Sequence, residues 1–187
     1  MVDAGCGEIS MMMRVILAVA ALLTASPALA KELVFRATLR GDTPSTTTGS
    51  KASGAARIVV DTDAKTVDVN LNVVGLKPED LRASLVKAPL GPIHLHLYGS
   101  TDHGPNSSAS LVLPVPYGQA YSATASGFQV RMKAYPYATG AAVVNTSAGF
   151  DEFVSSMQSG KVVLNIHTNR FPDGEISGDV VPATAGS

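Results

Sequence analysis

The stretch KTVDVNLNVVGL, residues 65–76, alternates apolar and polar side chains over most of its length. Its apolar positions are Val67, Val69, Leu71 and Val73, and Asp68, Asn70 and Asn72 lie between them. Successive side chains of a β-strand point to opposite faces of the sheet, so this pattern is typical of a strand with one face buried and one in water. The stretch therefore predicts an antiparallel sheet that is covered on one side.

Similar alternation on both sides of this stretch predicts further strands. We expect them near 33–39, 56–60, 92–98, 109–115 and 127–134, with a hairpin turn at 61–65 and a short helical turn from 78 to about 86. KVVLNIHT (161–168) and EISGDVV (175–181) predict a closing hairpin around the turn residues NRFPDG (169–174). The chain is thus expected to be an all-β protein.

One helix is predicted near 147–158. Phe150, Phe153, Val154 and Met157 recur at helical spacing, Ser147 or Asn145 is suited to cap the start, and Gly160 to end it. These strands with one short inserted helix describe a Greek-key immunoglobulin-like β-sandwich or a partly closed barrel.

Composition narrows the function classes. The net charge is −1 and no basic run is present, so nucleic acid is not an expected partner. A chain of 187 residues with 17 glycines and 11 prolines suits a single β domain rich in turns. We expect that domain at 31–182, followed by a short tail at 183–187.

Residues 1–30 have the pattern of a secretory signal peptide. Arg14 precedes the apolar run 15–23, and the small residues of Ala28-Leu29-Ala30 predict cleavage after Ala30. Translation could equally start at Met11, Met12 or Met13. The apolar run is too short for a membrane anchor, which needs roughly 20 residues. We therefore expect a secreted or periplasmic protein with no membrane span after cleavage, and without Cys6, its only cysteine.

Three of the four histidines lie in GPIHLHLYGSTDHGP, residues 91–105. In a strand, His94 and His96 share one face while Ile93, Leu95 and Leu97 occupy the other. His167 completes a three-imidazole set if its strand lies nearby, and such a set suits one zinc or copper ion. Further candidate ligands are Asp102, His103 and Glu175. The alternative is that the histidines only hydrogen-bond neighbouring loops.

Other chemistries have little support. GxSxG and HExxH motifs are absent from the sequence. Asp61 and Asp63 fit a hairpin turn better than a calcium loop, and Asp173 and Glu175 fit turn positions better than a glycosidase pair. Tyrosines in the Pro- and Gly-containing segment 114–140 suggest a protein-interaction surface as a further alternative.

Several motifs in this order resemble the CHRD domain, the module named from chordin, in its single-domain exported form. FRATLRGDTP (35–44) and SGAARIVVD (53–61) resemble its start, and IHLHLYG (93–99) resembles its HIHxG motif. LNIHTNRFPDGEISGDV (164–180) resembles its closing VHTxxxPxGEIRGQ. The matching positions are His94, His96, His167, Pro172, Gly174, Glu175 and Gly178.

The chain also departs from the CHRD pattern. Ser177 stands where the family has an arginine, Asp42-Thr43-Pro44 matches the opening only in part, and GSTDHGPNSS (99–108) is a reduced form of the glycine-rich loop. Functions that depend on that loop or that arginine are therefore not carried over.

The resemblance implies an immunoglobulin-like sandwich or barrel outside the cytoplasm, and it implies no reaction. We expect a non-enzymatic binding or structural module that holds one copper or zinc ion on His94, His96 and His167, with a protein or another envelope component as partner. The alternative is a mononuclear copper or zinc enzyme or metal carrier of the cell envelope. A weaker resemblance to copper–zinc superoxide dismutase is disfavoured, because the mature chain lacks cysteines and has too few histidines for two metals.

Overall fold

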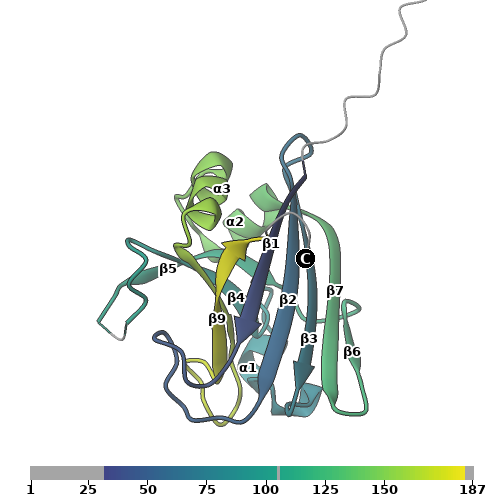
Figure 1. Cartoon of the computed structure of the whole chain (residues 1–187). Coiled ribbons are helices and arrows are strands. Elements are labelled where there is room, and N and C mark those ends of the chain that lie inside the picture. Colours follow the sequence, from purple (N-terminus) through teal and green to yellow (C-terminus); the bar gives the residue numbers. More distant parts are fainter. Residues whose placement is uncertain (1–31, 105, 184–187) are drawn as a thin grey trace, which may run out of the picture.

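A computed structural model describes residues 32–104 and 106–183 of the chain (Figure 1). The expected signal peptide and most of the expected tail lie outside the described residues. Within them, no helix is long and apolar enough to cross a membrane.

Strands are the predominant regular structure of the described chain. They are β1 (Glu32–Leu39), β2 (Ser53–Asp61), β3 (Thr66–Val74), β4 (Ile93–Tyr98), β5 (Ala109–Val115), β6 (Tyr121–Ala123), β7 (Gly127–Pro136), β8 (Val162–Ile166) and β9 (Ile176–Pro182). The helical elements are the 3-10 turn η1 (Pro78–Asp80) and the helices α1 (Ala83–Val86), α2 (Tyr137–Val144) and α3 (Phe150–Gln158). The all-β expectation is confirmed.

The nine strands of the described chain form one curled antiparallel sheet in the order β5-β4-β8-β9-β1-β2-β3-β7-β6. Of the two architectures expected, this is the partly closed barrel. The paired register between β1 and β9 is short and consists of Phe35 with Pro182 and Arg36 with Val181. The adjoining bridge between Arg40 and Ser177 extends that contact.

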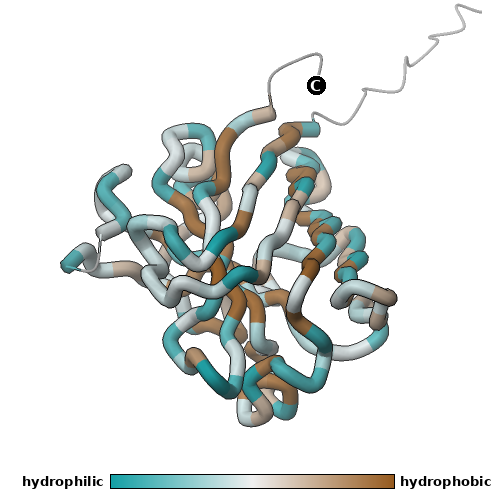
Figure 2. Tube along the Cα trace, turned by 60° about the horizontal axis from the view of Figure 1, so that its bottom comes forward, coloured by the Kyte–Doolittle hydropathy of each residue, from teal (hydrophilic) through white to brown (hydrophobic). Residues whose placement is uncertain are grey.

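The core lies inside the curl of the sheet. Val67, Val69, Leu71 and Val73 of β3 are buried as their alternation predicts, and Asn72 between them is exposed. From the other half of the sheet, Ile93 and Leu95 of β4 and Leu164 and Ile166 of β8 join the same apolar cluster. In Figure 2 the strands are brown over long inner stretches and the loops between them are mostly teal. Burial of these apolar faces is the main driving force for closing the sheet.

The helices differ from expectation in two ways. α3 begins at Phe150 after Gly149, later than a cap at Asn145 or Ser147 would place it. α2 was not expected, because its sequence YATGAAVV contains Gly140 and two β-branched valines, which are poor helix formers. Packing explains it: a Cβ at Gly140 would lie 2.7 Å from Leu113 Cδ1, so the glycine lets α2 lie close against β5.

The tyrosine-containing segment 114–140, suggested above as an interaction surface, consists largely of regular structure. It holds the end of β5, the short strand β6, all of β7 and the start of α2. The Tyr121 hydroxyl donates to the Val115 carbonyl at 2.7 Å, and the buried Tyr137 donates to the Ala148 carbonyl at 2.8 Å. Both side chains therefore join parts of this domain to one another.

Candidate metal centre

The sheet order brings the histidines together. β4 and β8 are neighbours, and their antiparallel register pairs His94 with Asn165 and His96 with Val163. Because side chains alternate along a strand, Ile93 and Leu95 point into the core while His94 and His96 point to the outer face. His167 directly follows β8 and lies on that same outer face, next to His94.

The three imidazoles form a compact set. Each offers a ring nitrogen, and these nitrogens all lie within 4.8 Å of one another. The shortest pair is His94 Nδ1 with His167 Nε2, at 3.1 Å. The exposed fractions of His94 and His167 are only 3% and 8%, and His96 is the least buried of the three.

Backbone carbonyls determine the tautomers of two of these rings. His94 Nε2 lies 2.7 Å from the Gly91 carbonyl oxygen, and His167 Nδ1 lies 2.8 Å from that of Pro172. A carbonyl only accepts, so both of these nitrogens carry the proton. In the neutral rings the opposite nitrogens then hold lone pairs, and they are the two atoms 3.1 Å apart. Two acceptors thus face each other inside the protein.

Burial keeps the rings neutral. It lowers the pKa of His94 to about 3, with a further contribution from the nearby His167 and opposition from the bond to Gly91. Burial, together with His167, lowers the pKa of His96 to about 4. The pKa of His167 is also lowered, again mainly by burial. At neutral pH the inward lone pairs are therefore available without a competing proton.

The spacing suits one ion after a small adjustment. Two nitrogens bound at 2.0–2.1 Å to a tetrahedral ion are about 3.4 Å apart, close to the 3.1 Å between His94 and His167. The wider separations involve His96, whose Nε2 is buried and has no hydrogen-bond partner among the described residues. Binding therefore requires the His96 ring to turn toward the other two.

The further candidate ligands lie elsewhere. His103 Nδ1 pairs with Asp179 Oδ1 at 2.9 Å, and the His103 ring contacts Tyr98. Asp102 Oδ1 accepts from the Gly104 amide within its own turn. The buried Glu175 accepts hydrogen bonds from the hydroxyls of Ser50 and Thr168. None of these carboxylates, nor His103, belongs to the three-imidazole set of the described chain.

Residues of the closing motif support the site from outside. Pro172 supplies the carbonyl that orients His167, and the Arg82 guanidinium donates to the same oxygen at 2.8 Å. A Cβ at Gly178 would overlap the Thr38 carbonyl oxygen, so this glycine permits the close approach of β9 to β1. These roles depend on contacts between residues far apart in the chain.

Ser177 stands at the position where the CHRD motif has an arginine. It is fully buried, and its hydroxyl lies 2.6 Å from that of Thr43 and 2.7 Å from that of Ser45. The opening loop therefore closes over β9 through three hydroxyl groups. The Ser177 side chain itself carries no charge, unlike an arginine at this position.

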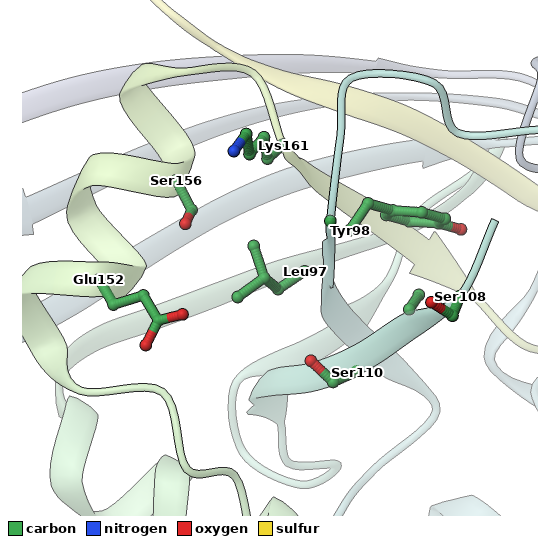
Figure 3. A pocket seen from close by; sticks show the side chains of 9 residues that line it. Leu97, Tyr98, Ser108, Ser110, Glu152, Ser156 and Lys161 are labelled. Carbon is green, nitrogen blue, oxygen red and sulfur yellow. The ribbon is translucent and has the colours of Figure 1, made fainter.

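A separate polar hollow of about 390 Å³ lies between α3 and the adjoining ends of β4 and β5 (Figure 3). Glu152 and Ser156 of α3 and Lys161 line one side, and Leu97, Tyr98 and Ser110 line the other. It shares no residue with the histidine set. No motif in the sequence pointed to it, because its lining comes from three separate segments.

Comparison with known proteins gives one match. The family model described as CHRD domain matches residues 35–180, a range that includes all four histidines and the closing hairpin. No curated protein and no solved structure gives a significant match. CHRD domains are found in extracellular or secreted proteins and suggest a binding or structural module. The match covers most of the chain, and this protein therefore belongs to the CHRD domain family.

Proposed function

We propose that this CHRD domain is an extracytoplasmic, non-enzymatic binding or structural module that holds one copper or zinc ion on His94, His96 and His167. The observation that carries the proposal is the contact between two lone-pair nitrogens, His94 Nδ1 and His167 Nε2, at 3.1 Å. Without a bound cation this contact is repulsive, because both ring protons are committed to outward carbonyls. A cation between the nitrogens turns it into an attractive one.

The choice of ion follows from the donor set. Neutral imidazole suits zinc and copper, whereas magnesium and calcium prefer oxygen ligands. The carbonyls of Gly91 and Pro172 act as the outer partners that usually orient metal-binding histidines. Burial of His94 and His167 favours an ion that is retained inside the domain and stabilises the end of the barrel.

Export is part of the same proposal. The apolar run and small-residue pattern before residue 31 support delivery through a signal peptide. Outside the cytoplasm a site made only of imidazoles has an advantage, because it needs no reduced thiol. We infer that the ion is bound after export and that a protein or envelope partner recognises the loaded domain.

Equilibrium dialysis of the purified protein against copper and zinc, followed by metal analysis, tests the site. We expect one ion per chain, and loss of that ion when His94, His96 and His167 are all replaced by alanine. The variant His103→Ala is the matched control and should retain the ion, since His103 pairs with Asp179 instead. Equal metal content in the wild type and the triple variant would disprove the proposal.

A further inference from the structure

Asn165 adjoins all three histidines on the outer face of β4 and β8. Asn165 pairs directly with His94 of the neighbouring strand. His167 follows Asn165 two residues later in the chain, on the same face of the sheet. His96 pairs with Val163 and is therefore its diagonal neighbour. Opposed side chains on antiparallel strands are about 4.5–5.5 Å apart at Cβ, and diagonal ones about 7–8 Å. The Asn165 side chain thus stands beside the proposed metal centre.

The amide of Asn165 is buried and only half satisfied. Asn165 is only 7% exposed. Nδ2 donates one long hydrogen bond, at 3.3 Å, to the Asp173 carbonyl, and this bond distinguishes the nitrogen from the oxygen. Oδ1 is fully buried and has no partner among the described residues. A buried acceptor without a partner lowers the stability of the folded protein. Packing alone therefore does not explain why an amide occupies this position.

The neighbouring backbone makes room for this amide. Gly174 has φ +130°, a conformation that side-chain-bearing residues rarely adopt, and a Cβ there would overlap the amide group of Asn165. A leucine at position 165 would have the same number and branching of side-chain heavy atoms without an unmet hydrogen bond. The fold therefore accommodates a polar group beside the histidines at a cost to its own stability.

We propose that Asn165 selects the ligand at the fourth position of the ion: its Oδ1 accepts a hydrogen bond from a bound water or hydroxide and so favours ligands that carry a proton over bare anions. This inference rests on the proposed metal site. Three imidazoles leave one tetrahedral position for an outside ligand. An anion such as azide, bound there through nitrogen, has no proton for Oδ1 and must displace a water that has one.

Azide binding to the copper-loaded protein tests the selection, with the azide-to-copper charge-transfer absorption as the readout. Asn165→Leu removes the acceptor and keeps the number and branching of side-chain heavy atoms, so the Kd for azide should fall about tenfold, the worth of one hydrogen bond. Asn165→Asp keeps the shape and adds negative charge, so its Kd for azide should rise. Because the two variants should change the azide Kd in opposite directions, loss of the acceptor can be distinguished from a change in the size of the side chain.

Two measurements keep the outcomes distinct. Copper content should remain at one ion per chain in both variants, and a wild-type protein that binds neither copper nor zinc would instead overturn the proposed function itself. Urea unfolding of the metal-free Asn165→Leu variant should give a midpoint equal to or above that of the wild type, since an orphaned polar group has been removed. If copper binds normally but Asn165→Leu leaves the azide Kd unchanged or raises it, the role of Asn165 is wrong.

Discussion

At His94 and His167, backbone carbonyls decide which ring nitrogen carries the proton. The carbonyls of Gly91 and Pro172 each accept one ring N–H, and the remaining lone pairs of His94 and His167 therefore face each other. Neither carbonyl is identifiable from the sequence, because Gly91 and Pro172 lie in turns whose geometry depends on the fold. The HxH spacing of His94 and His96 was sufficient to place those two rings on one face.

A pH dependence of stability follows from these buried rings. The pKa of His94 is about 3 in the folded protein and that of His96 about 4, against 6.5 in the unfolded chain. Below about pH 6.5 the unfolded chain therefore binds more protons, and the free energy of unfolding falls as the pH decreases toward 4. At about pH 5 the metal-free protein should lose about 2 kcal/mol for each of the two histidines.

Urea unfolding in the presence of a chelator, at about pH 7.5 and about pH 5, measures this loss. The variant His96→Gln removes one of these buried groups and should show a smaller dependence. Equal stability of the wild type at both pH values would mean that the rings are not buried in the neutral form.

Gly178 carries a second prediction at this scale. Its missing side chain lets β9 approach the Thr38 carbonyl of β1. Gly178→Ala should lower the free energy of unfolding by about 1–3 kcal/mol, because the backbone on both sides must shift. Gly99→Ala is the matched control, since a Cβ at Gly99 meets nothing within 4 Å and the change should be small. A similar effect of both substitutions on urea unfolding would contradict this explanation.

Among the elements, the strands were the most predictable. The alternation of residues 67–73 predicts both the strand β3 and its buried face, and the runs at 109–115 and 162–166 became β5 and β8. α2 and the three-residue β6 were missed, because neither has a periodic pattern long enough to recognise. Their positions follow from packing against β5 and β7.

Glu175 joins two elements that the sequence does not connect. Its carboxylate accepts from Ser50 in the loop before β2 and from Thr168 in the closing hairpin. Thr48 in the same loop also donates to the Glu175 carbonyl at 2.7 Å. This set of bonds holds the loop against the hairpin that carries His167.

Glu175→Ala should therefore loosen the loop as well as destabilise the domain. Loss of two hydrogen bonds to a charged group should lower the free energy of unfolding by about 3 kcal/mol or more, and amide hydrogen exchange of residues 48–52 should accelerate. Glu79→Ala, at an exposed position of η1, is the control. Unchanged exchange in the Glu175 variant would show that the loop is held by other contacts.

For the whole molecule, the family and the all-β class were within reach of the sequence, and the sheet order was not. β4 and β8 are separated by more than sixty residues, and no periodicity specifies that they pair. The position of His167 beside His94 therefore depends on the fold and not on any local spacing in the sequence. The same limit applies to Asn165, whose significance depends on three neighbours and on Gly174.

Export can be tested on the whole chain. Expressed in a Gram-negative bacterium from its full coding sequence, the protein should be recovered from the periplasm or medium with Lys31 as its first residue. Mass spectrometry of the intact protein gives that terminus directly. Recovery of an uncleaved chain in the cytoplasm would contradict the predicted signal peptide, whichever of Met1, Met11, Met12 or Met13 begins translation.

Long-range nitrogen–proton NMR of the histidine rings tests the central claim most directly, because it reports the protonation of each ring nitrogen. Before metal is added, His94 should be the Nε2–H tautomer and His167 the Nδ1–H tautomer. With zinc, the resonances of His94 Nδ1, His167 Nε2 and the His96 ring should shift together and stop changing at one equivalent. His103 should be unaffected. Opposite tautomers, or zinc-induced shifts that exclude any of the three rings, would contradict the proposed site.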